Sequence, residues 1–199
     1  MTRFVFCHHA EMADRRPAGE ESEKYPGITI KGEKETREKA RVLAEMVCDL
    51  SDGSVVILSG ISRAVRTRST LAVYADEFEK LLADKASIAV FNFANTYSLA
   101  QKRLMALKAL SKEITNGGRR SGVTVIHLPL TVEQFVASPG DDEEKAGELM
   151  LEGLGELQKF FRRTFPKNPL CIVSVGHSIA LNGLFHRVIK ERRKEFSFI

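Results

Sequence analysis

Chemically active side chains follow three apolar stretches of this 199-residue sequence. The stretches and the residues after them are 4 to 7 with His8 and His9, 55 to 59 with Arg63, and 171 to 175 with His177. Short apolar runs that end in polar residues are typical of buried parallel strands, whose carboxyl ends meet at one edge of a sheet. We therefore expect these polar residues to lie together at that edge.

Imidazole and guanidinium groups at one place can bind and transfer a phosphoryl group. An imidazole nitrogen can attack phosphorus and form a phosphoramidate, which divides the hydrolysis of a phosphomonoester into two easier steps. The negative oxygens of the transferring group favour an always-charged guanidinium and a second, protonatable imidazole as partners. We interpret His9 as the nucleophile, with Arg63 and His177 holding the phosphoryl group.

Arg63 is expected in the first turn of a helix, because Ser62 can cap a helix that runs to about Leu82. A cation at that end of a helix is unfavourable for the helix dipole, whereas an anion bound there is favourable. A surface arginine is the alternative, but the position favours Arg63 as an anion ligand.

Further segments with regular apolar spacing separate the strands. The spacing predicts helices from about residue 33 to 52, 62 to 82, 97 to 114, 141 to 161 and from 178 onward, and short strands at 88 to 91 and 123 to 128. Strands separated by helices of this length need crossover connections. We therefore predict an α/β fold, a three-layer sandwich with a mostly parallel central sheet and helices on both faces. Residues 12 to 30 are predicted to form a long loop that overhangs the site.

This set of residues resembles the histidine phosphatase (phosphoglycerate mutase-like) superfamily. Members have Arg-His-Gly after the first strand, an arginine at the start of the next helix, and a late histidine. The matching positions are His8-His9-Ala10, Arg63 and His177. The chain departs from the family where His8 replaces the arginine and Ala10 the glycine.

The resemblance extends to Ile28-Thr29-Ile30-Lys31-Gly32 with Ala40, which looks like the opening of the family's first helix, and covers roughly residues 1 to 80 and 165 to 190. It implies a single phosphoglycerate mutase-like domain over residues 1 to 199, with a variable region at about 88 to 140. It also implies a phosphohistidine intermediate at His9, with no metal and no organic cofactor. His8, His9, Arg63 and His177 would bind the phosphate.

Hydrolysis also needs an acid that protonates the leaving oxygen. Glu133 follows the strand predicted at 123 to 128 and a leucine much as the family's acid does. A solvent-facing acid at a helix start is an equally good interpretation of Glu133. Glu11, Asp76 and Glu77 are further candidates.

Two other functions stay open. Replacing an arginine by His8 removes donors and permanent charge, so a weakly active or inactive phospho-ligand-binding regulatory protein on the same fold is the main alternative. A metal site built from His8, His9 and His177 is disfavoured, because successive side chains of a strand point to opposite faces.

Composition is that of an ordinary soluble globular domain, with 43% hydrophobic and 28% charged residues. Apolar runs fall short of the ~20 residues of a membrane helix, so we expect a cytoplasmic protein with no membrane partner. Cys7, Cys48 and Cys171 are interpreted as reduced core residues. The net charge of +4 is modest, so we expect a small anionic phosphorylated substrate and not a nucleic acid. The sequence does not indicate the oligomeric state.

Overall fold

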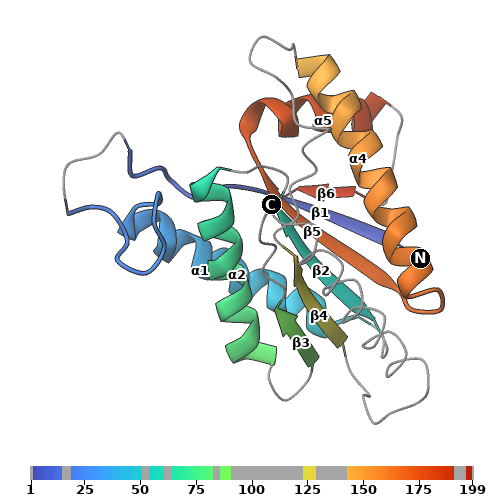
Figure 1. Ribbon diagram of the computed structural model, residues 1–199, viewed down its shortest axis with the longest axis horizontal. Coiled ribbons are helices and arrows are strands. Elements are labelled where there is room, and N and C mark those ends of the chain that lie inside the picture. The colour runs from blue at the N-terminus through green and yellow to red at the C-terminus, as the bar shows by residue number, and fades with distance from the viewer. Residues whose placement is uncertain are drawn as a thin grey trace, which may run out of the picture.

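The computed structural model describes residues 2–14, 19–50, 54–60, 64–82, 86–90, 123–128, 143–190 and 196–198, which form an α/β fold (Figure 1). In chain order the elements are β1 (Thr2–His8), α1 (Ile30–Cys48), β2 (Val55–Gly60), α2 (Val65–Leu82), β3 (Ala86–Val90), β4 (Val123–Leu128), α4 (Glu143–Thr164), β5 (Leu170–Gly176), α5 (Ser178–Lys190) and β6 (Phe196–Phe198). The alternation of strands and helices confirms the predicted α/β class.

The described strands form one six-stranded sheet in the order β3-β4-β2-β5-β1-β6. Each neighbouring pair is parallel, as the crossover helices require. β5 lies between β1 and β2, so the strands that end near the polar residues singled out in the sequence are direct neighbours. Their carboxyl ends meet in the middle of one sheet edge, where open α/β sheets bind ligands.

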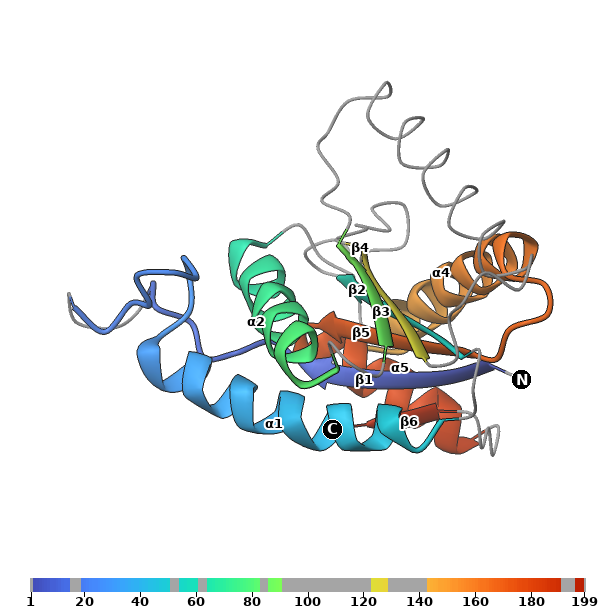
Figure 2. The ribbon, with the colours of Figure 1, turned by 90° about the horizontal axis from the view of Figure 1, so that it is seen from below.

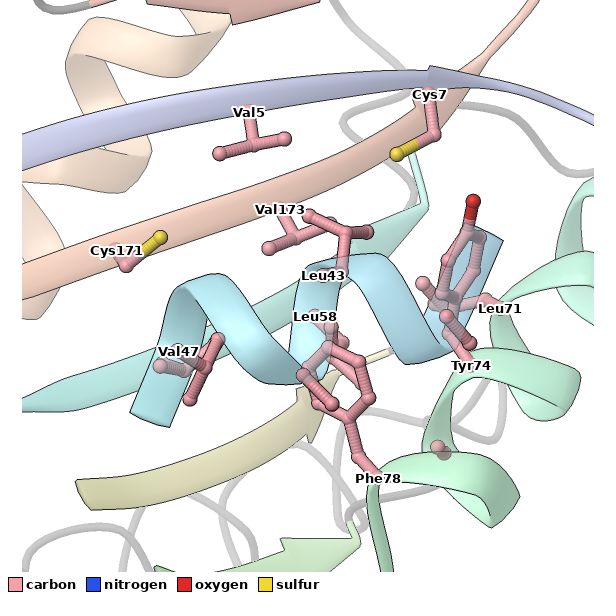
Figure 3. Packing of buried hydrophobic residues seen from close by; sticks show 14 of the residues in the cluster. Val5, Cys7, Leu43, Val47, Leu58, Leu71, Tyr74, Phe78, Cys171 and Val173 are labelled. Carbon is pink, nitrogen blue, oxygen red and sulfur yellow. The ribbon is translucent and has the colours of Figure 1, made fainter. Parts of the chain in front are cut away.

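One face of the sheet packs against α1 and α2. Side chains of β1, β2 and β5 on this face form a buried cluster with residues of both helices, as Figure 3 shows. From α1 the cluster takes Ala40, Leu43 and Val47, which recur at steps of three and four and therefore share one side of the helix. Leu71, Tyr74 and Phe78 do the same on α2.

The opposite face of the sheet is also covered. Phe4 and Phe6 alternate with the residues of the first cluster along β1, so they point to this second face, and both are buried. Figure 2 shows α4 on the side of the sheet away from α1. α4 packs on α5, and the backbones approach so closely that a Cβ on Gly147 would lie 2.4 Å from the carbonyl carbon of Gly183.

α1 begins at Ile30, three residues before the predicted start. The reason is Thr29, whose side chain accepts a hydrogen bond from Gly32 N and caps the helix. Gly32 also lets the first turn approach the segment after β1, because a Cβ there would lie 2.8 Å from Glu11 N. The segment that follows β1 and the start of α1 are thus in direct contact.

Other boundaries differ from the prediction as well. α2 begins at Val65, later than the predicted start at Ser62, and the short strand β6 was not predicted. The loop predicted at 12 to 30 contains isolated antiparallel bridges, Met12 with Ile28 and Glu21 with Thr29. The helix predicted at 97 to 114 lies outside the described residues.

The prediction that the cysteines are reduced core residues is confirmed for two of the three. Cys7 and Cys171 are buried and free, and burial raises the pKa of each thiol to about 11. Both therefore stay protonated inside the sheet's first core cluster. Cys48 is the last residue of α1.

Candidate functional site

Residues that follow three adjacent strands meet at the carboxyl edge of the sheet. His9 follows β1, and its backbone N–H donates to Gly176 O at the end of β5 (3.1 Å). His177 follows β5 directly and starts α5, since its carbonyl oxygen accepts from Leu181 N (2.9 Å). Arg66 lies in the first turn of α2, the helix that follows β2.

Arg66 contacts both histidines. Its Nε donates to His9 Nε2 (3.3 Å), and its Nη2 donates to His177 Nδ1 (3.4 Å), both at the long end of hydrogen-bond distances. The rings of His9 and His177 lie edge to face with centroids 4.9 Å apart, and the His8 ring is 4.2 Å from that of His9. One guanidinium and three imidazoles therefore form a single cluster.

The backbone fixes the tautomer of His9. Its Nδ1 lies 2.7 Å from Ala10 O, and because a carbonyl oxygen can only accept, Nδ1 holds the proton. The lone pair is then on Nε2, the atom that faces Arg66. His8 is oriented in the same way, since its Nδ1 lies 2.8 Å from His9 O.

Burial keeps the half-buried His9 and His177 neutral. Desolvation is the main cause that lowers the pKa of His9, and it outweighs the hydrogen bond to Ala10, which raises that pKa. The pKa of His177 falls to about 4, first through burial and then through the nearby His9 ring and the Arg66 charge. At neutral pH both rings thus present lone pairs.

Arg66 is a half-buried cation without an acidic partner in the described part of the chain. No aspartate or glutamate described in the structure forms an ion pair with it, and its side-chain hydrogen bonds go to His9 and His177. A guanidinium offers five donors in a fork that fits carboxylates and phosphates. The cluster therefore has one permanent positive charge that no acid of the described residues pairs with, and Asp14 is the carboxylate that acts on His9 from further away. This arrangement favours an anion as ligand.

The residues predicted from the sequence are only partly brought together. His8, His9 and His177 lie in the cluster, whereas Arg63 and Glu133 lie outside the described residues. Arg66 was missed by the sequence reasoning. An arginine was expected in the first turn of this helix, which would have indicated Arg66 had the helix start been predicted correctly. The helix was predicted to begin at Ser62, three residues before its observed start at Val65.

The other acidic candidates have partners elsewhere. Thr29 Oγ1 donates to the Glu11 carboxylate (2.9 Å), which ties Glu11 to the cap of α1. Asp76 accepts from Tyr25 Oη (2.6 Å), and Glu77 is paired with Arg37. These contacts indicate structural roles for all three carboxylates.

The described residues include neither a set of three ligands for a metal ion nor a membrane-spanning helix. No three His, Cys, Asp or Glu side chains among them are placed to hold one metal ion. None of the helices in that part of the chain is long and apolar enough to cross a membrane.

Comparisons with known proteins do not assign a family. No family model matches the chain, and no curated protein matches it. Among solved structures, it is similar to the C-terminal domain of the DEAD-box protein Dbp5, at 13% identity and a TM-score of 0.38, over all of this chain and 89% of that one. A substituted S. cerevisiae Dbp5 C-terminal domain bound to Gle1 and IP6 gives 12% identity and a TM-score of 0.40, over all of this chain and 90% of that one. We draw no functional argument from similarity at this level.

Proposed function

We propose that the chain is a metal-independent phosphatase of the histidine phosphatase kind, with a phosphoglycerate mutase-like arrangement of its three layers. It hydrolyses a phosphomonoester or a phosphohistidine through a covalent intermediate on His9. The observation that supports this proposal is the contact of Arg66 with both His9 Nε2 and His177 Nδ1. A cation between two imidazoles, one of them with its lone pair fixed on Nε2, suits phosphoryl transfer.

In the first step the phosphoryl oxygens take over the hydrogen bonds of Arg66, which releases the lone pair of His9 Nε2. This lone pair attacks phosphorus, the P–N bond forms, and the bond from phosphorus to the leaving oxygen breaks. The hydrogen bond from His9 Nδ1 to Ala10 O stabilises the positive charge that develops on the ring. Arg63 is a second phosphate ligand in this mechanism, and Glu133 is the acid that protonates the leaving oxygen.

In the second step water attacks the phosphoryl group from the side that the leaving group has vacated. The Glu133 carboxylate left by the first step takes a proton from this water. The P–N bond breaks, its electrons return to His9 Nε2, and inorganic phosphate leaves with the oxygen of the water. Arg66 and His177 face the phosphoryl oxygens in both steps. Uptake of a proton by His177 when the anion arrives would strengthen its hydrogen bond to the anion.

Hydrolysis of 4-nitrophenyl phosphate, with and without EDTA, tests the proposal. The wild-type chain should hydrolyse the ester equally with and without chelator. His9→Ala should lose essentially all turnover, and it should also lose the acid-labile label that a ³²P-phosphorylated substrate leaves on the wild type. Undiminished turnover in His9→Ala would remove His9 from the mechanism.

A phospho-ligand-binding protein without turnover is the second candidate function. His8 favours it, because this exposed imidazole stands at the end of β1 where the resembling family has an arginine. Binding of inorganic phosphate, measured by calorimetry, distinguishes the two candidates. Phosphate binding that Arg66→Met abolishes, together with no hydrolysis of aryl or alkyl phosphates, would favour the binding protein.

A further inference from the structure

Thr70 connects the segment after β1 to the first turn of α2. It lies one turn after Arg66 and is 1% exposed. Its Oγ1 accepts a hydrogen bond from Ala10 N (2.9 Å) and donates one to Arg66 O (2.7 Å). A threonine hydroxyl in a helix commonly donates to the carbonyl four residues earlier, but here the same oxygen also accepts from another element.

We propose that Thr70 is a positioning residue that sets the distance between His9 and Arg66. The inference rests on the proposed function, since that distance matters for phosphoryl transfer. Ala10 directly follows His9, so the hydrogen bond from Ala10 N holds the backbone beside the nucleophile. The hydrogen bond to Arg66 O holds the backbone of the cation, and one hydroxyl therefore links both.

The first turns of α2 also pack against the loop that precedes α1. Gly27 has φ of +80° and packs so closely that a Cβ would lie 3.3 Å from Arg66 N. Ser69 Oγ donates to Pro26 O (2.6 Å) and fixes the same loop to α2. These contacts hold α2 against the loop, whereas the contact of Thr70 with Ala10 holds it against the end of β1. Losing the hydroxyl should therefore shift the turn relative to His9 without releasing it from the loop.

Two other buried threonines serve as matched controls. Thr36 on α1 is 3% exposed and donates to Gly32 O (2.7 Å), the same bond to the fourth preceding carbonyl that Thr70 makes. Thr67 is fully buried beside Arg66, and its Oγ1 has no hydrogen-bond partner among the described residues. Valine at either position removes a buried hydroxyl without breaking the link between Ala10 and Arg66.

The test compares Thr70→Val and Thr70→Ser in 4-nitrophenyl phosphate hydrolysis. Thr70→Val keeps the shape but leaves Ala10 N without its acceptor, so kcat should fall about 100-fold, as expected for a displacement near 1 Å. Thr70→Ser retains both hydrogen bonds and should stay within about 3-fold of wild type. Thr36→Val and Thr67→Val should also keep kcat within about 3-fold. Equal kcat in wild type, Thr70→Val and Thr70→Ser would overturn the inference.

A second readout does not depend on turnover. NMR titration measures the pKa values of the His9 and His177 rings. The charged or titratable groups that act on His9 are His8, Asp14 and Arg66. Moving Arg66 away should raise both pKa values in Thr70→Val toward the ordinary histidine range, while Thr70→Ser and Thr36→Val leave them unchanged. Thr70→Ala removes the same hydroxyl without an added methyl group and replaces Thr70→Val if that variant does not fold.

The two readouts distinguish failure of this inference from failure of the proposed function. A wild type that hydrolyses nothing, with histidine pKa values that rise in Thr70→Val, would defeat the phosphatase and support the positioning role. A wild type that hydrolyses the ester, with pKa values and kcat unaffected by Thr70→Val and Thr70→Ala, would support the phosphatase and defeat the positioning role.

Discussion

Arg37 and Arg66 are both partly buried arginines in the first half of a helix, but they have opposite surroundings. Arg37 on α1 donates to Glu33 (2.7 Å), to Glu77 and to Tyr25 Oη (3.2 Å). Arg66 on α2 donates to two imidazoles. The first arginine is neutralised by carboxylates, whereas the second has none beside it in the described structure.

The contacts around Arg37 form a network that fastens the loop before α1. Ser22 donates to Glu33 (2.5 Å), and Tyr25 donates to Asp76 (2.6 Å), which is also paired with Lys24. Burial alone would raise the pKa of Glu77, but hydrogen bonds from Lys80 and Arg37 outweigh it and lower that pKa. Each acid of this network thus has a donor, which is the arrangement of a structural ion-pair network.

The difference shows how a binding site can be separated from a structural one. Positive and negative charges in the Arg37 network already balance, so an added anion would gain little and would meet acidic groups. Arg66 is partly buried and forms no ion pair with the described residues, so a bound anion would gain more there. The surroundings of an arginine are therefore more informative than its presence.

Exchanging each arginine for methionine gives the largest expected effects and tests this comparison directly. Arg66→Met should lower kcat/KM for 4-nitrophenyl phosphate about 100- to 1000-fold, as loss of a transition-state donor does. Its free energy of unfolding should change by less than about 1 kcal/mol, because no ion pair of the described structure is broken. Hydrolysis kinetics and urea unfolding measure the two quantities.

Arg37→Met should behave in the opposite way. Among the described residues it leaves the buried Glu77 with Lys80 as its one cationic partner, so the free energy of unfolding should fall by about 3 kcal/mol. Its kcat should stay within about 3-fold of wild type where the variant is folded. Arg68→Met alters an exposed arginine of α2 and should change neither quantity. If Arg37→Met lost turnover as fully as Arg66→Met, the separation of the two regions would be wrong.

Much of the arrangement could be predicted from the sequence. The apolar runs that become β1, β2 and β5 fix which residues follow the strands, and parallel crossovers then place His9 and His177 at one edge. No local sequence pattern predicts the order of the strands in the sheet. In the structure, β2, β5 and β1 are adjacent. His9 and His177 therefore lie together because each follows the carboxyl end of one of two neighbouring strands, β1 and β5.

The contact of Arg66 with the histidines could not be predicted in this way. Arg63, Arg66 and Arg68 lie within six positions, and which of them lies in the first turn of α2 depends on where the helix begins. Ser62 has the residue type of a helix cap, which favoured Arg63. The loop packs against Val65 and Arg66 through Gly27, and this tertiary contact at the observed start of α2 is invisible in local sequence.

His8→Arg should have a smaller effect and sharpen the comparison by adding charge to the site. A guanidinium next to His9 adds a permanent cation and charge-assisted hydrogen bonds, each of which contributes roughly 1.5 to 3 kcal/mol to binding. Inorganic phosphate should bind about 10-fold more tightly, and aryl phosphate hydrolysis should be faster. Calorimetry and steady-state kinetics measure both, with His186→Arg as a control that adds the same charge on the exposed side of α5. Weaker binding and slower hydrolysis together would mean that the site is shaped around imidazole and that its ligand is not a plain phosphomonoester.

The smallest expected effect is a difference in pH dependence between the two regions. The pKa of His177 falls from 6.5 to about 4 on folding, so the unfolded chain binds more protons between these values. The free energy of unfolding should therefore decrease as the pH falls from about 6.5 to about 4. Glu33, Asp76 and Glu77 have lowered pKa values, so their network is stable above the ordinary carboxylate range and loses its contribution only at lower pH.

Urea unfolding at a series of pH values separates two pH ranges. The upper window, from about 6.5 to about 4, is that of His177, and the lower window, below the ordinary carboxylate range, is that of the Arg37 network. His177→Gln should reduce the loss of stability between about pH 6.5 and 4, to which His9 also contributes because its pKa is lowered, and should leave the loss at lower pH. Arg37→Met should reduce the loss at lower pH and leave the other. His186→Gln removes an exposed histidine of the same helix and controls for the substitution itself. Saturating phosphate should also flatten the upper window, because a bound anion favours protonated His177 and raises its pKa. A pH dependence between about 6.5 and 4 that persists unchanged in His177→Gln would show that His177 does not cause it. If phosphate left this dependence of the wild type unchanged, His177 would not face the anion.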